Sequence, residues 1–537
     1  MTMTESTETK SLETALFSAA DALRSKMDAN EYKNYLLGII FYKYLSDSML
    51  YEIADEIGDG RENTTLAEAQ KLYEENADDE DLQDELMDTF SYVITPEHTF
   101  TKVMEHVNDH SFQIVNLVDA FKEIEGTNET FEGLFDDVDL FSRRLGNNAQ
   151  KQADTISAVL SAISDLELVQ SPGDTLGDAY EYLISQFASE SGKKAGEFYT
   201  PQKVSELLTR LTLVGKQYPE GMTVYDPTMG SGSLLLNFKK YIGESQKDEI
   251  IYYGQEINTS TYNLARMNMI LHHVDTANQH LRNGDTLDAD WPPSAKTNFD
   301  AVVMNPPYSL HWSSAKGFLE DPRFSKYGVL APKSKADYAF LLHGFYHLKN
   351  TGTMAIVLPH GVLFRGAKEG KIRQKLLEDG SIDAVIGLPA NLFYSTSIPT
   401  TIVVLKKDKQ DRSVMFIDAS KEFEKGKNQN QLREEDLDKI IKTYEERKDV
   451  DKYAHLATFD EIKENDFNLN IPRYVDTFEP EPEVDLKQVS KDLAEVNRQI
   501  KDNERELVEM LKQLTSKDDD IMEGINDIIQ NFEEDLK

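Results

Sequence analysis

The sequence of 537 residues contains no cysteine, which excludes disulfide bonds, thiol chemistry and every cysteine-ligated metal site. It also lacks an apolar run close to the roughly 20 residues that a membrane-spanning helix needs. The first ten residues, MTMTESTETK, lack the hydrophobic region of a signal peptide. These absences predict a cytoplasmic protein that does not enter a membrane.

Basic residues are scarce relative to acidic ones. Lys and Arg total 57 against 96 Asp and Glu, which gives a formal net charge of −39. This balance argues against tight, unaided binding to a polyanion such as DNA. Fifteen of the acidic side chains fall within residues 51–90, beside only Arg61 and Lys71. We interpret this stretch as a solvated helical face, with a partner-binding or DNA-repelling surface as the alternative.

The chain is long enough for two or three domains, because a single core stops growing at roughly 250–300 residues. Apolar residues recur with helical spacing up to about residue 170. From about 220, short apolar runs alternate with helical segments; the runs are TVYD, IIYYGQEI, FDAVVMN, GTMAIVLP, SIDAVIGLP and TTIVVLKK. This alternation predicts a doubly wound, mostly parallel α/β sheet. We expect a helical domain at 1–170, an α/β domain at 171–475 and a helical tail at 476–537.

The tail carries a seam of apolar residues at alternating steps of three and four, with Asn503 in the one skipped position. The seam comprises Leu486, Val489, Leu493, Val496, Ile500, Leu507, Met510 and Leu514. Four heptads of this kind predict a coiled-coil helix that packs against another helix. We favour a helix of a partner subunit; the alternative is that the tail folds back on its own chain.

The stretch TVYDPTMGSGSLLL, residues 223–236, has the features of a ligand-binding turn. A strand ends at Asp226, Gly230 and Gly232 permit a tight turn with close backbone approach, and a helix begins near Ser233. The spacing is not the phosphate-binding Gly-x-Gly-x-x-Gly, so a nucleoside without pyrophosphate is the better ligand. Glu256, at the end of the next strand, is placed to accept ribose hydroxyls. Together these features predict an adenosine-type cofactor.

The stretch VVMNPPYSL, residues 302–310, reads as a buried strand that ends in an amide, two prolines and an aromatic ring. The amine of adenine is a poor nucleophile because its lone pair is delocalised into the ring. If the Asn305 side-chain oxygen and the Pro306 carbonyl accept hydrogen bonds from that amine, the lone pair is freed. Pro307 helps to fix the backbone, and Tyr308 offers a face for a flat base. The stretch therefore predicts a clamp that activates a nitrogen.

The Asp-Pro-x-x-Gly-x-Gly turn followed by Asn-Pro-Pro-Tyr resembles the S-adenosylmethionine-dependent amino-methyltransferases of class I fold. The whole chain is similar to the methylation subunits of type I restriction-modification systems. Further stretches carry that resemblance: LRSKMDANEYKNYLLGIIFYKYLSD near the start, GEFYTP at 196–201, LPANLFYSTSIPTTIVVL at 388–405 and NDFNLNIPRYV at 465–475. The resemblance implies a Rossmann-like catalytic domain that transfers methyl from S-adenosylmethionine to the N6 amine of adenine in double-stranded DNA.

The resemblance also implies roles for individual residues. A cofactor lid near the methionine would comprise Glu197, Phe198, Tyr199, Thr200, Pro201 and Gln202. The turn after the first strand would hold the cofactor through Asp226, Met229, Gly230, Ser231, Gly232 and Ser233, with Glu256 on the ribose and Asp285 near the adenine. The target base, flipped from the duplex, would meet Asn305, Pro306, Pro307, Tyr308 and, as a second aromatic, Phe393.

A chain of charge −39 that modifies DNA needs a cationic local surface or a partner that carries recognition. Two locally basic segments follow predicted strand ends: residues 311–335, with Lys316, Arg323, Lys326, Lys333 and Lys335, and residues 361–375, with Arg365, Lys368, Lys371, Arg373 and Lys375. We expect phosphate contacts there, with ordinary solvated loops as the alternative. The resemblance implies a separate specificity subunit, two methylation subunits for each, and an endonuclease/translocase subunit in the full complex.

The residues alone leave other functions open. The Asn-Pro-Pro-Tyr clamp also suits a protein glutamine amide or the amine of cytosine, and the chain could be a non-catalytic scaffold. Metal catalysis is not expected, because His343 and His347 lie four residues apart without a carboxylate in a known ligand pattern. We interpret both as packing or surface histidines.

Overall fold

The computed structural model describes residues 14–15, 17–169, 177, 180–181, 183–185, 187, 199–218, 221–293, 298–394, 396–427, 429–477 and 485–535. The chain divides into two compact units, Met1–Asp476 and Thr477–Lys537, and each is described by itself. No helix among these residues combines the length and apolarity that crossing a bilayer requires.

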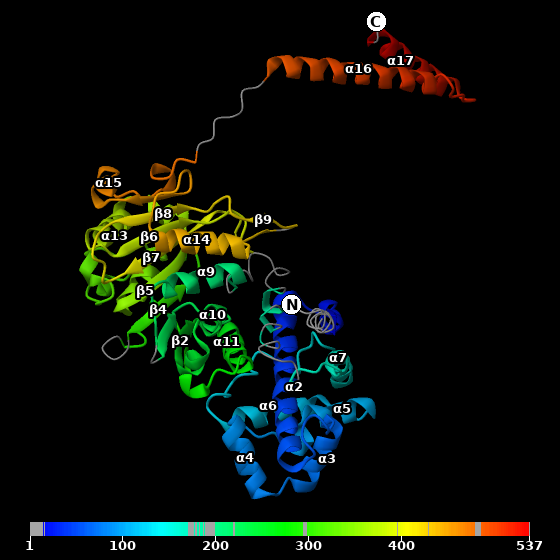
Figure 1. Ribbon diagram of the computed structural model, residues 1–537. Coiled ribbons are helices and arrows are strands. Elements are labelled where there is room, and N and C mark those ends of the chain that lie inside the picture. Colours follow the sequence, from blue (N-terminus) through cyan, green and yellow to red (C-terminus); the bar gives the residue numbers. More distant parts are fainter. Residues whose placement is uncertain are drawn as a thin grey trace. The chain divides into compact units, whose positions relative to one another are not determined.

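The first unit begins with a helical region around the long helix α2 (Ala29–Ile57), drawn in blue in Figure 1. Leu36, Leu37, Ile39, Ile40, Phe41 and Tyr42 of α2 are all fully buried, so the middle of this helix is enclosed on every side. One hydrophobic core joins α2 to shorter helices, which are α3 (Leu66–Asn76), α4 (Glu80–Phe90), α5 (Phe100–Asn108), α6 (Ile114–Thr127) and α7 (Ala149–Ile163).

The acidic stretch at residues 51–90 lies along the outer face of these helices. Fourteen of its fifteen carboxylate side chains are exposed, and Glu52 is half-buried. Thr65 and Glu68 form a capping box that starts α3. Arg61 pairs with Asp55. The exposure agrees with the interpretation of this stretch as a solvated face.

A nine-stranded sheet in the order β11-β8-β6-β7-β5-β4-β1-β2-β3 forms the rest of the first unit. Its strands are β1 (Met222–Asp226), β2 (Ile250–Glu256), β3 (Gln279–Asn283), β4 (Phe299–Met304), β5 (Leu348–Pro359), β6 (Ile382–Gly387), β7 (Thr400–Lys406), β8 (Val414–Asp418) and β11 (Ala454–Ala457). Pairs β1–β2, β1–β4, β2–β3, β4–β5 and β6–β8 are parallel, and β7 runs antiparallel between β5 and β6. A small hairpin joins β9 (Glu424–Lys425) to β10 (Asn430–Gln431).

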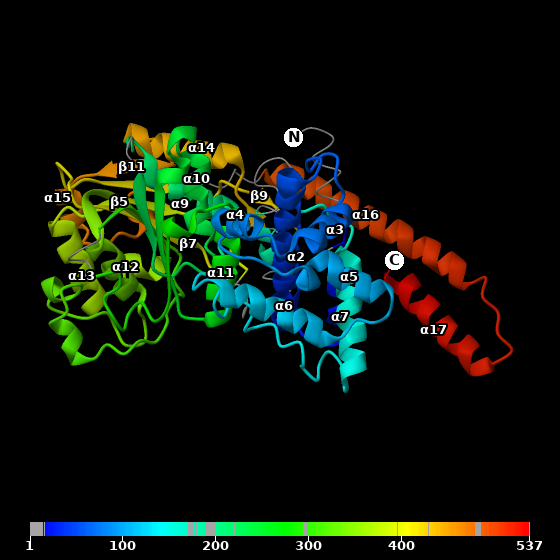
Figure 2. The same cartoon turned by 90° about the horizontal axis from the view of Figure 1, so that it is seen from below.

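Helices cover both faces of the sheet, as Figure 2 shows. One core contains residues of α9 (Gln202–Leu213), α10 (Ser233–Tyr241) and α14 (Glu434–Glu446); the opposite core contains residues of α12 (Asp337–Tyr346), α13 (Ala367–Glu378) and α15 (Phe459–Glu464). The central strands are therefore continuous apolar runs rather than alternating ones. In β4, only Asp300 is not fully buried, and its carboxylate accepts from Thr223 N at 2.9 Å.

The helical region packs against helix α11 (Thr259–Leu271) of the sheet. Leu264, Met267 and Leu271 of α11 belong to the core of the helical region. Arg266 donates to the carbonyl of Glu132 at 3.0 Å and to that of Thr130. This contact joins the two parts of the first unit through the helix that follows β2.

The second unit consists of α16 (Leu486–Leu511) and α17 (Asp519–Asp535), linked by an ion pair between Lys512 and Glu533 at 2.8 Å. All eight predicted seam residues, from Leu486 to Leu514, are 40–76% exposed. Leu514 lies beyond the end of α16, so the helix is shorter than the seam. Val508, which is off the seam, is the buried residue of α16.

The structure confirms the predicted fold class: a mainly parallel, doubly wound sheet, a helical N-terminal region and helices at the C-terminal end. Each of the six predicted apolar runs forms a strand. The strands β3, β8, β9, β10 and β11 were not predicted. The boundaries assigned to three domains stay a prediction.

Candidate active site

The carboxyl ends of β1, β2 and β4 lie side by side at one edge of the sheet. β1 lies between β2 and β4, so the chain proceeds in opposite directions from β1, which is the point where open α/β sheets bind their ligands. Asp226 and Glu256 are the last residues of β1 and β2, and Asn305 directly follows β4. The sheet therefore brings the two predicted motifs together.

The turn after β1 has the backbone that its glycines predict. Gly230 and Gly232 have φ values of 56° and 83°, in the left-handed region that favours glycine, and α10 starts at Ser233. The Gly230 amide donates to Glu256 Oε2 at 3.2 Å, and the Met229 amide donates to the Gln255 carbonyl at 2.9 Å. The turn is thus fixed against the end of β2.

The Asp226 carboxylate is fully buried and only partly satisfied. Its Oδ1 accepts from the Thr228 amide at 2.9 Å and from the Thr228 hydroxyl at 3.3 Å. Its Oδ2 has no hydrogen-bond partner among the described residues. Burial raises the pKa of this carboxyl to about 8. A cationic ligand group beside Oδ2 would satisfy the oxygen and stabilise the ionised form.

Glu256 and Asp285 lie next to this turn. Glu256 Oε1 accepts from the Asn258 amide at 2.8 Å, and burial raises the pKa of the carboxyl. A carboxylate has about four lone-pair sites, so Glu256 can still accept from ligand hydroxyls. Asp285 is exposed and accepts from the Leu287 amide at 2.9 Å. The Thr286 hydroxyl ties this second turn to the Pro227 carbonyl.

Serine side chains and an asparagine complete the base of the turn. The hydroxyls of Ser231 and Ser233 lie 3.0 Å apart, and Asn268 donates through Nδ2 to the Ser231 carbonyl at 3.0 Å. Asn268 is fully buried, and its Oδ1 has no partner within the described part of the chain.

The Asn305 amide is held at both ends. Its Nδ2 donates to the Thr200 hydroxyl at 2.9 Å, and its Oδ1 accepts from the Tyr308 hydroxyl at 2.7 Å. Burial raises the pKa of Tyr308, so its hydroxyl stays a donor. A carbonyl-type oxygen has two lone pairs, which leaves Oδ1 one further acceptor site. The Tyr308 and Phe393 rings meet edge to face, with centroids 6.3 Å apart.

The backbone after Tyr308 is anchored to α12 rather than free in solvent. The Ser309 amide donates to Asp337 Oδ1 at 2.8 Å, and Asp337 Oδ2 pairs with Arg365 Nη1 at 3.1 Å. Pro306 is buried and Pro307 is half-buried. The clamp is therefore supported by a buried carboxylate and an arginine.

The predicted lid is described from Tyr199 onward. Tyr199 is buried, with its ring 6.1 Å from that of Tyr394. Pro201 precedes α9, and Gln202 donates through Nε2 to Asn237 Oδ1 at 3.1 Å. Glu197 and Phe198 lie outside the described residues. Tyr394 and the contact of Thr200 with Asn305 were not predicted; the position of Tyr394 next to Phe393 was the available signal.

The prediction of phosphate contacts was wrong for Arg323 and Arg373, which are almost fully buried. Arg365 is half-buried and pairs with Asp337 and Glu369, and a phosphate contact of Arg365 stays a prediction. The three guanidinium groups bind carbonyls and carboxylates, because a long cationic side chain close to a fold's buried polar groups satisfies those first. Exposed lysines remain in both segments, namely Lys316, Lys326, Lys333, Lys368 and Lys371.

His343 and His347 are fully buried, which confirms their interpretation as packing residues. Among the described residues no group of His, Asp and Glu has the arrangement of a metal site.

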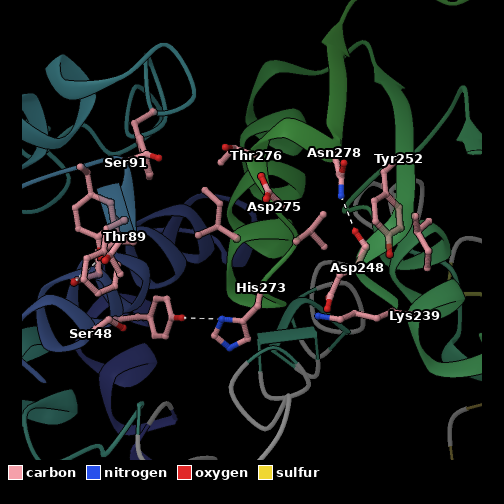
Figure 3. Close-up of a pocket in the computed structure, with 18 of the residues that line it drawn as sticks. Ser48, Thr89, Ser91, Lys239, Asp248, Tyr252, His273, Asp275, Thr276 and Asn278 are labelled. Carbon is pink, nitrogen blue, oxygen red and sulfur yellow. Dashed lines mark hydrogen bonds between the residues drawn. The ribbon is translucent and has the colours of Figure 1, made fainter. Parts of the chain in front are cut away.

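A cavity of about 530 Å³ lies at the other end of β2 (Figure 3). Ile250 and Tyr252, near the start of that strand, line it together with Tyr44 and His273, whose side chains are hydrogen-bonded to each other at 3.5 Å. Its position at the amino end of β2 separates it from Glu256, so it is not part of the candidate site.

Sequence comparison finds two families. The profile described as N-6 DNA Methylase matches residues 171–483, and that described as HsdM N-terminal domain matches residues 12–163. The chain is 36% identical over 530 residues to the type I restriction enzyme MpnII methylase subunit of Mycoplasma pneumoniae, covering 94% of this chain and 96% of that one. It is 30% identical to the MjaVII methylase subunit of Methanocaldococcus jannaschii, covering 90% and 81%.

Among solved structures, the methyltransferase subunit of a type I restriction-modification system from Streptococcus thermophilus is 58% identical, with a TM-score of 0.84, and the match covers 88% of this chain and 100% of that one. A modification subunit from Vibrio vulnificus, described as part of a type I restriction enzyme, shares the fold at 16% identity and a TM-score of 0.60, covering 88% and 97%.

Proposed function

The chain belongs to the N-6 DNA methylase family and is the methylase subunit of a type I restriction-modification system, an adenine-specific DNA methyltransferase; on that premise we propose which of its residues hold the cofactor, the base and the partners. The family implies S-adenosylmethionine as the cofactor.

The turn after β1 fits the amino-acid and ribose parts of S-adenosylmethionine. Asp226 Oδ2, buried and without a partner in the described residues, suits the ammonium group of a methionine. Gly230 and Gly232 allow the ligand to lie against the backbone, and Glu256 accepts the ribose hydroxyls. The remaining contacts come from Tyr199, Pro201, Gln202, Met229, Ser231, Ser233 and Asp285, with Glu197 and Phe198 completing the lid.

When bound, the cofactor supplies a methyl group on a positively charged sulfur. The task of this chain is to present the target amine to it. Asn305 Oδ1 accepts one N–H of the adenine amine and the Pro306 carbonyl accepts the other, which frees the nitrogen lone pair. Tyr308 and Phe393 enclose the base once their rings, which now contact each other edge to face, separate to admit it. Pro307 restrains the backbone. Positioning supplies most of the rate enhancement, and the product nitrogen loses its surplus proton to water.

The acceptor is double-stranded DNA whose site is chosen by a separate specificity subunit. The exposed lysines that follow β4 and β5 are suited to phosphates. The exposed apolar row of α16 docks on the specificity subunit, with two methylase subunits for each, and an endonuclease/translocase subunit joins for cleavage. The complex works in the cytoplasm, and residues 1–170, 171–475 and 476–537 act as its helical, catalytic and docking parts.

The observation that carries the proposal is the placement of Asn305 beside the edge formed by Asp226 and Glu256. The test is modified-base sequencing of genomic DNA from cells with and without this gene, together with calorimetric titration of the purified chain with S-adenosylmethionine. We expect N6-methyladenine to disappear from one bipartite motif, and binding at one site per chain. An unchanged methylome despite cofactor binding would contradict the proposed role of the clamp.

A further inference from the structure

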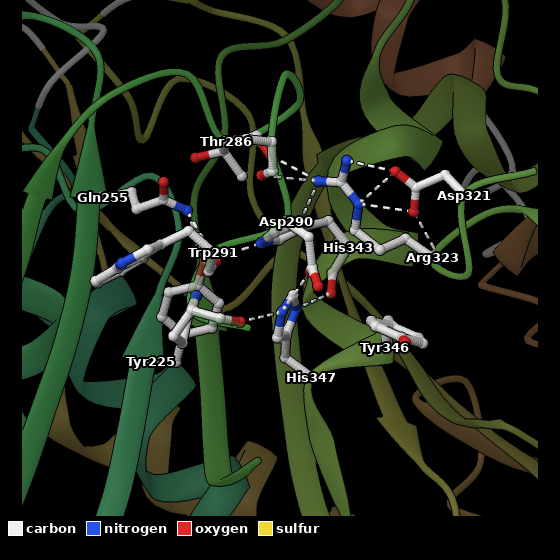
Figure 4. A network of polar contacts seen from close by, with 12 residues as sticks. Tyr225, Gln255, Thr286, Asp290, Trp291, Asp321, Arg323, His343, Tyr346 and His347 are labelled. Atoms are coloured by element: carbon white, nitrogen blue, oxygen red, sulfur yellow. Dashed lines mark hydrogen bonds and ion pairs between the residues drawn. The ribbon is translucent and has the colours of Figure 1, made fainter. Parts of the chain in front are cut away.

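Arg323 lies in the segment that follows the base clamp, yet it is 2% exposed and its guanidinium is enclosed by acceptors. Its Nη1 donates to the carbonyls of Thr286 at 3.0 Å and Ala289 at 3.2 Å. Its Nε and Nη2 donate to Asp321, with a shortest distance of 2.7 Å. Figure 4 shows the Arg323 side chain between Thr286 and Asp321. A buried arginine with this many partners fixes whatever it binds.

The element that Arg323 binds is the turn after β3, which carries Asp285. The segment just after this turn, at Trp291, is held from the strand side. The Trp291 carbonyl accepts from the Tyr225 hydroxyl at 2.8 Å and from Gln255 Nε2 at 3.2 Å. Tyr225 and Gln255 directly precede the two carboxylates of the cofactor edge, Asp226 and Glu256. The turn and the segment after it are therefore fastened to β1 and β2 on one side and to Arg323 on the other.

A histidine connects Arg323 to the clamp side. Arg323 Nη1 lies 3.1 Å from His343 Nδ1, and His343 Nε2 lies 2.8 Å from the Tyr225 hydroxyl. Burial lowers the pKa of His343, so the ring is neutral and its Nδ1 can accept. His343 belongs to α12, whose first residue, Asp337, holds the backbone of Ser309. One guanidinium thus contacts parts of the fold that support both halves of the site.

We propose that Arg323 is a positioning residue for the adenine part of the cofactor: it holds the turn of residues 285–289 at the place where Asp285 meets that ring. This inference rests on the proposed function of the edge. Arg323 contacts no reacting atom; it acts through the carbonyls of Thr286 and Ala289. Lysine cannot replace it, because an ammonium lacks the planar set of donors that reaches two carbonyls, a carboxylate and an imidazole together.

Arg323→Lys should weaken S-adenosylmethionine by about 10-fold or more, since two charge-assisted hydrogen bonds to the turn are lost. At saturating cofactor, kcat should stay within about threefold, because Arg323 binds the turn directly and reaches the clamp only through His343 and α12. The probe 5′-methylthioadenosine, which lacks the amino-acid part, should lose affinity by the same factor. Asp226→Asn should weaken S-adenosylmethionine but leave 5′-methylthioadenosine unaffected, since Asp226 faces the amino-acid part.

Arg373 provides the matched control. It is 3% exposed and donates to the carbonyls of Phe467, Val362 and Arg365 at 2.8–3.0 Å, away from the cofactor edge. Arg373→Lys should lower the unfolding temperature to a similar extent and change cofactor affinity less than about twofold. Calorimetry on the full chain gives the affinities, and tritiated methyl transfer by its assembled complex gives kcat and KM.

Thr286→Val serves as a second variant should Arg323→Lys not fold, because it removes the tie between the same turn and Pro227. It too should weaken 5′-methylthioadenosine, by several-fold. Equal losses of affinity in the Arg323 and Arg373 variants, or wild-type affinity in the Arg323 and Thr286 variants, would overturn the inference. Wild-type chain that does not bind S-adenosylmethionine at all would instead overturn the proposed function of the edge.

Discussion

The edge of the sheet has a cofactor half, at the ends of β1 and β2, and a clamp half, at the end of β4. The two halves differ in how many of their buried polar groups have hydrogen-bond partners. On the cofactor half, Asp226 Oδ2 and Asn268 Oδ1 lack partners among the described residues. On the clamp half, both ends of the Asn305 amide and both oxygens of Asp337 are bound within the chain. An unsatisfied buried polar group costs about 1–3 kcal/mol. The cofactor half therefore gives up stability that a ligand can restore, whereas the clamp half is organised before any ligand arrives.

The largest expected effect is a loss of kcat when the clamp half is changed. Asn305→Ala should lower kcat for DNA methylation by at least about 100-fold, because a positioned acceptor of the target amine is lost. Cofactor affinity should stay within twofold. Tritiated methyl transfer and calorimetry measure the two quantities. The control is Asn278→Ala, which removes a hydrogen-bonded asparagine at the cavity near the amino end of β2 and should leave kcat unchanged. Near-normal activity of Asn305→Ala would contradict the proposed role of the clamp.

The next effect tests the unsatisfied half. Asp226→Asn should weaken S-adenosylmethionine by about 10–100-fold, since a charge-assisted contact is lost. The variant without ligand should nevertheless unfold no more easily than the wild type at pH 8. The folded pKa of about 8 exceeds the unfolded value near 3.8, so ionisation of Asp226 lowers the stability of the wild type as pH rises from about 4 to 8. A marked fall in the unfolding temperature of the variant would contradict this half of the comparison.

The support of the clamp should give a smaller loss. Thr200→Val removes the acceptor of Asn305 Nδ2 at nearly constant volume and should lower kcat by about tenfold through loss of amide orientation. Thr200→Ser keeps the hydroxyl and should recover most of that rate. Single-turnover methyl transfer separates this change from product release; equal rates for the valine and serine variants would mean that the clamp does not depend on this contact.

The smallest expected effect is the release of a proton when the cofactor binds. Without ligand, Asp226 is largely protonated at pH 7. Beside the ammonium group of the bound cofactor it should be ionised, so cofactor binding should release close to one proton. Affinity for S-adenosylhomocysteine should then rise by about tenfold from pH 7 to 8.5. Titrations at pH 7 in two buffers of different ionisation enthalpy count the proton. Asp226→Asn should show neither the release nor the pH dependence; the same release from the variant would assign the proton to another group.

The sequence predicted those strands whose own residues show how they are buried. The runs of β1, β2 and β4 to β7 were predicted because a strand covered on both faces must be continuously apolar. β3, with the sequence QHLRN, is an edge strand of half-buried and exposed residues and carries no such signal. The family resemblance pointed to an N6-adenine methylase, which the comparisons confirm, so the protein-amide and scaffold alternatives are set aside.

The contacts around the site were less accessible to prediction. Thr200 and Asn305 are 105 positions apart and meet only because α9 starts beside the end of β4. Charge was misleading for Arg323 and Arg373, since a basic residue in a sequence gives no indication of whether carbonyls surround it in the fold. The glycine turn was predicted well, because a backbone conformation with positive φ limits the residue type directly.

The exposed row on α16 has a consequence for how the subunit is supplied in a cell. Leu486, Leu493 and Met510 are each more than half exposed, and an apolar row of this length drives self-association in water. If this row docks on the specificity subunit, every methylase subunit made in excess of that partner keeps the row exposed to water. Excess copies are then removed by aggregation and proteolysis, so the scarcer subunit determines how much active enzyme accumulates.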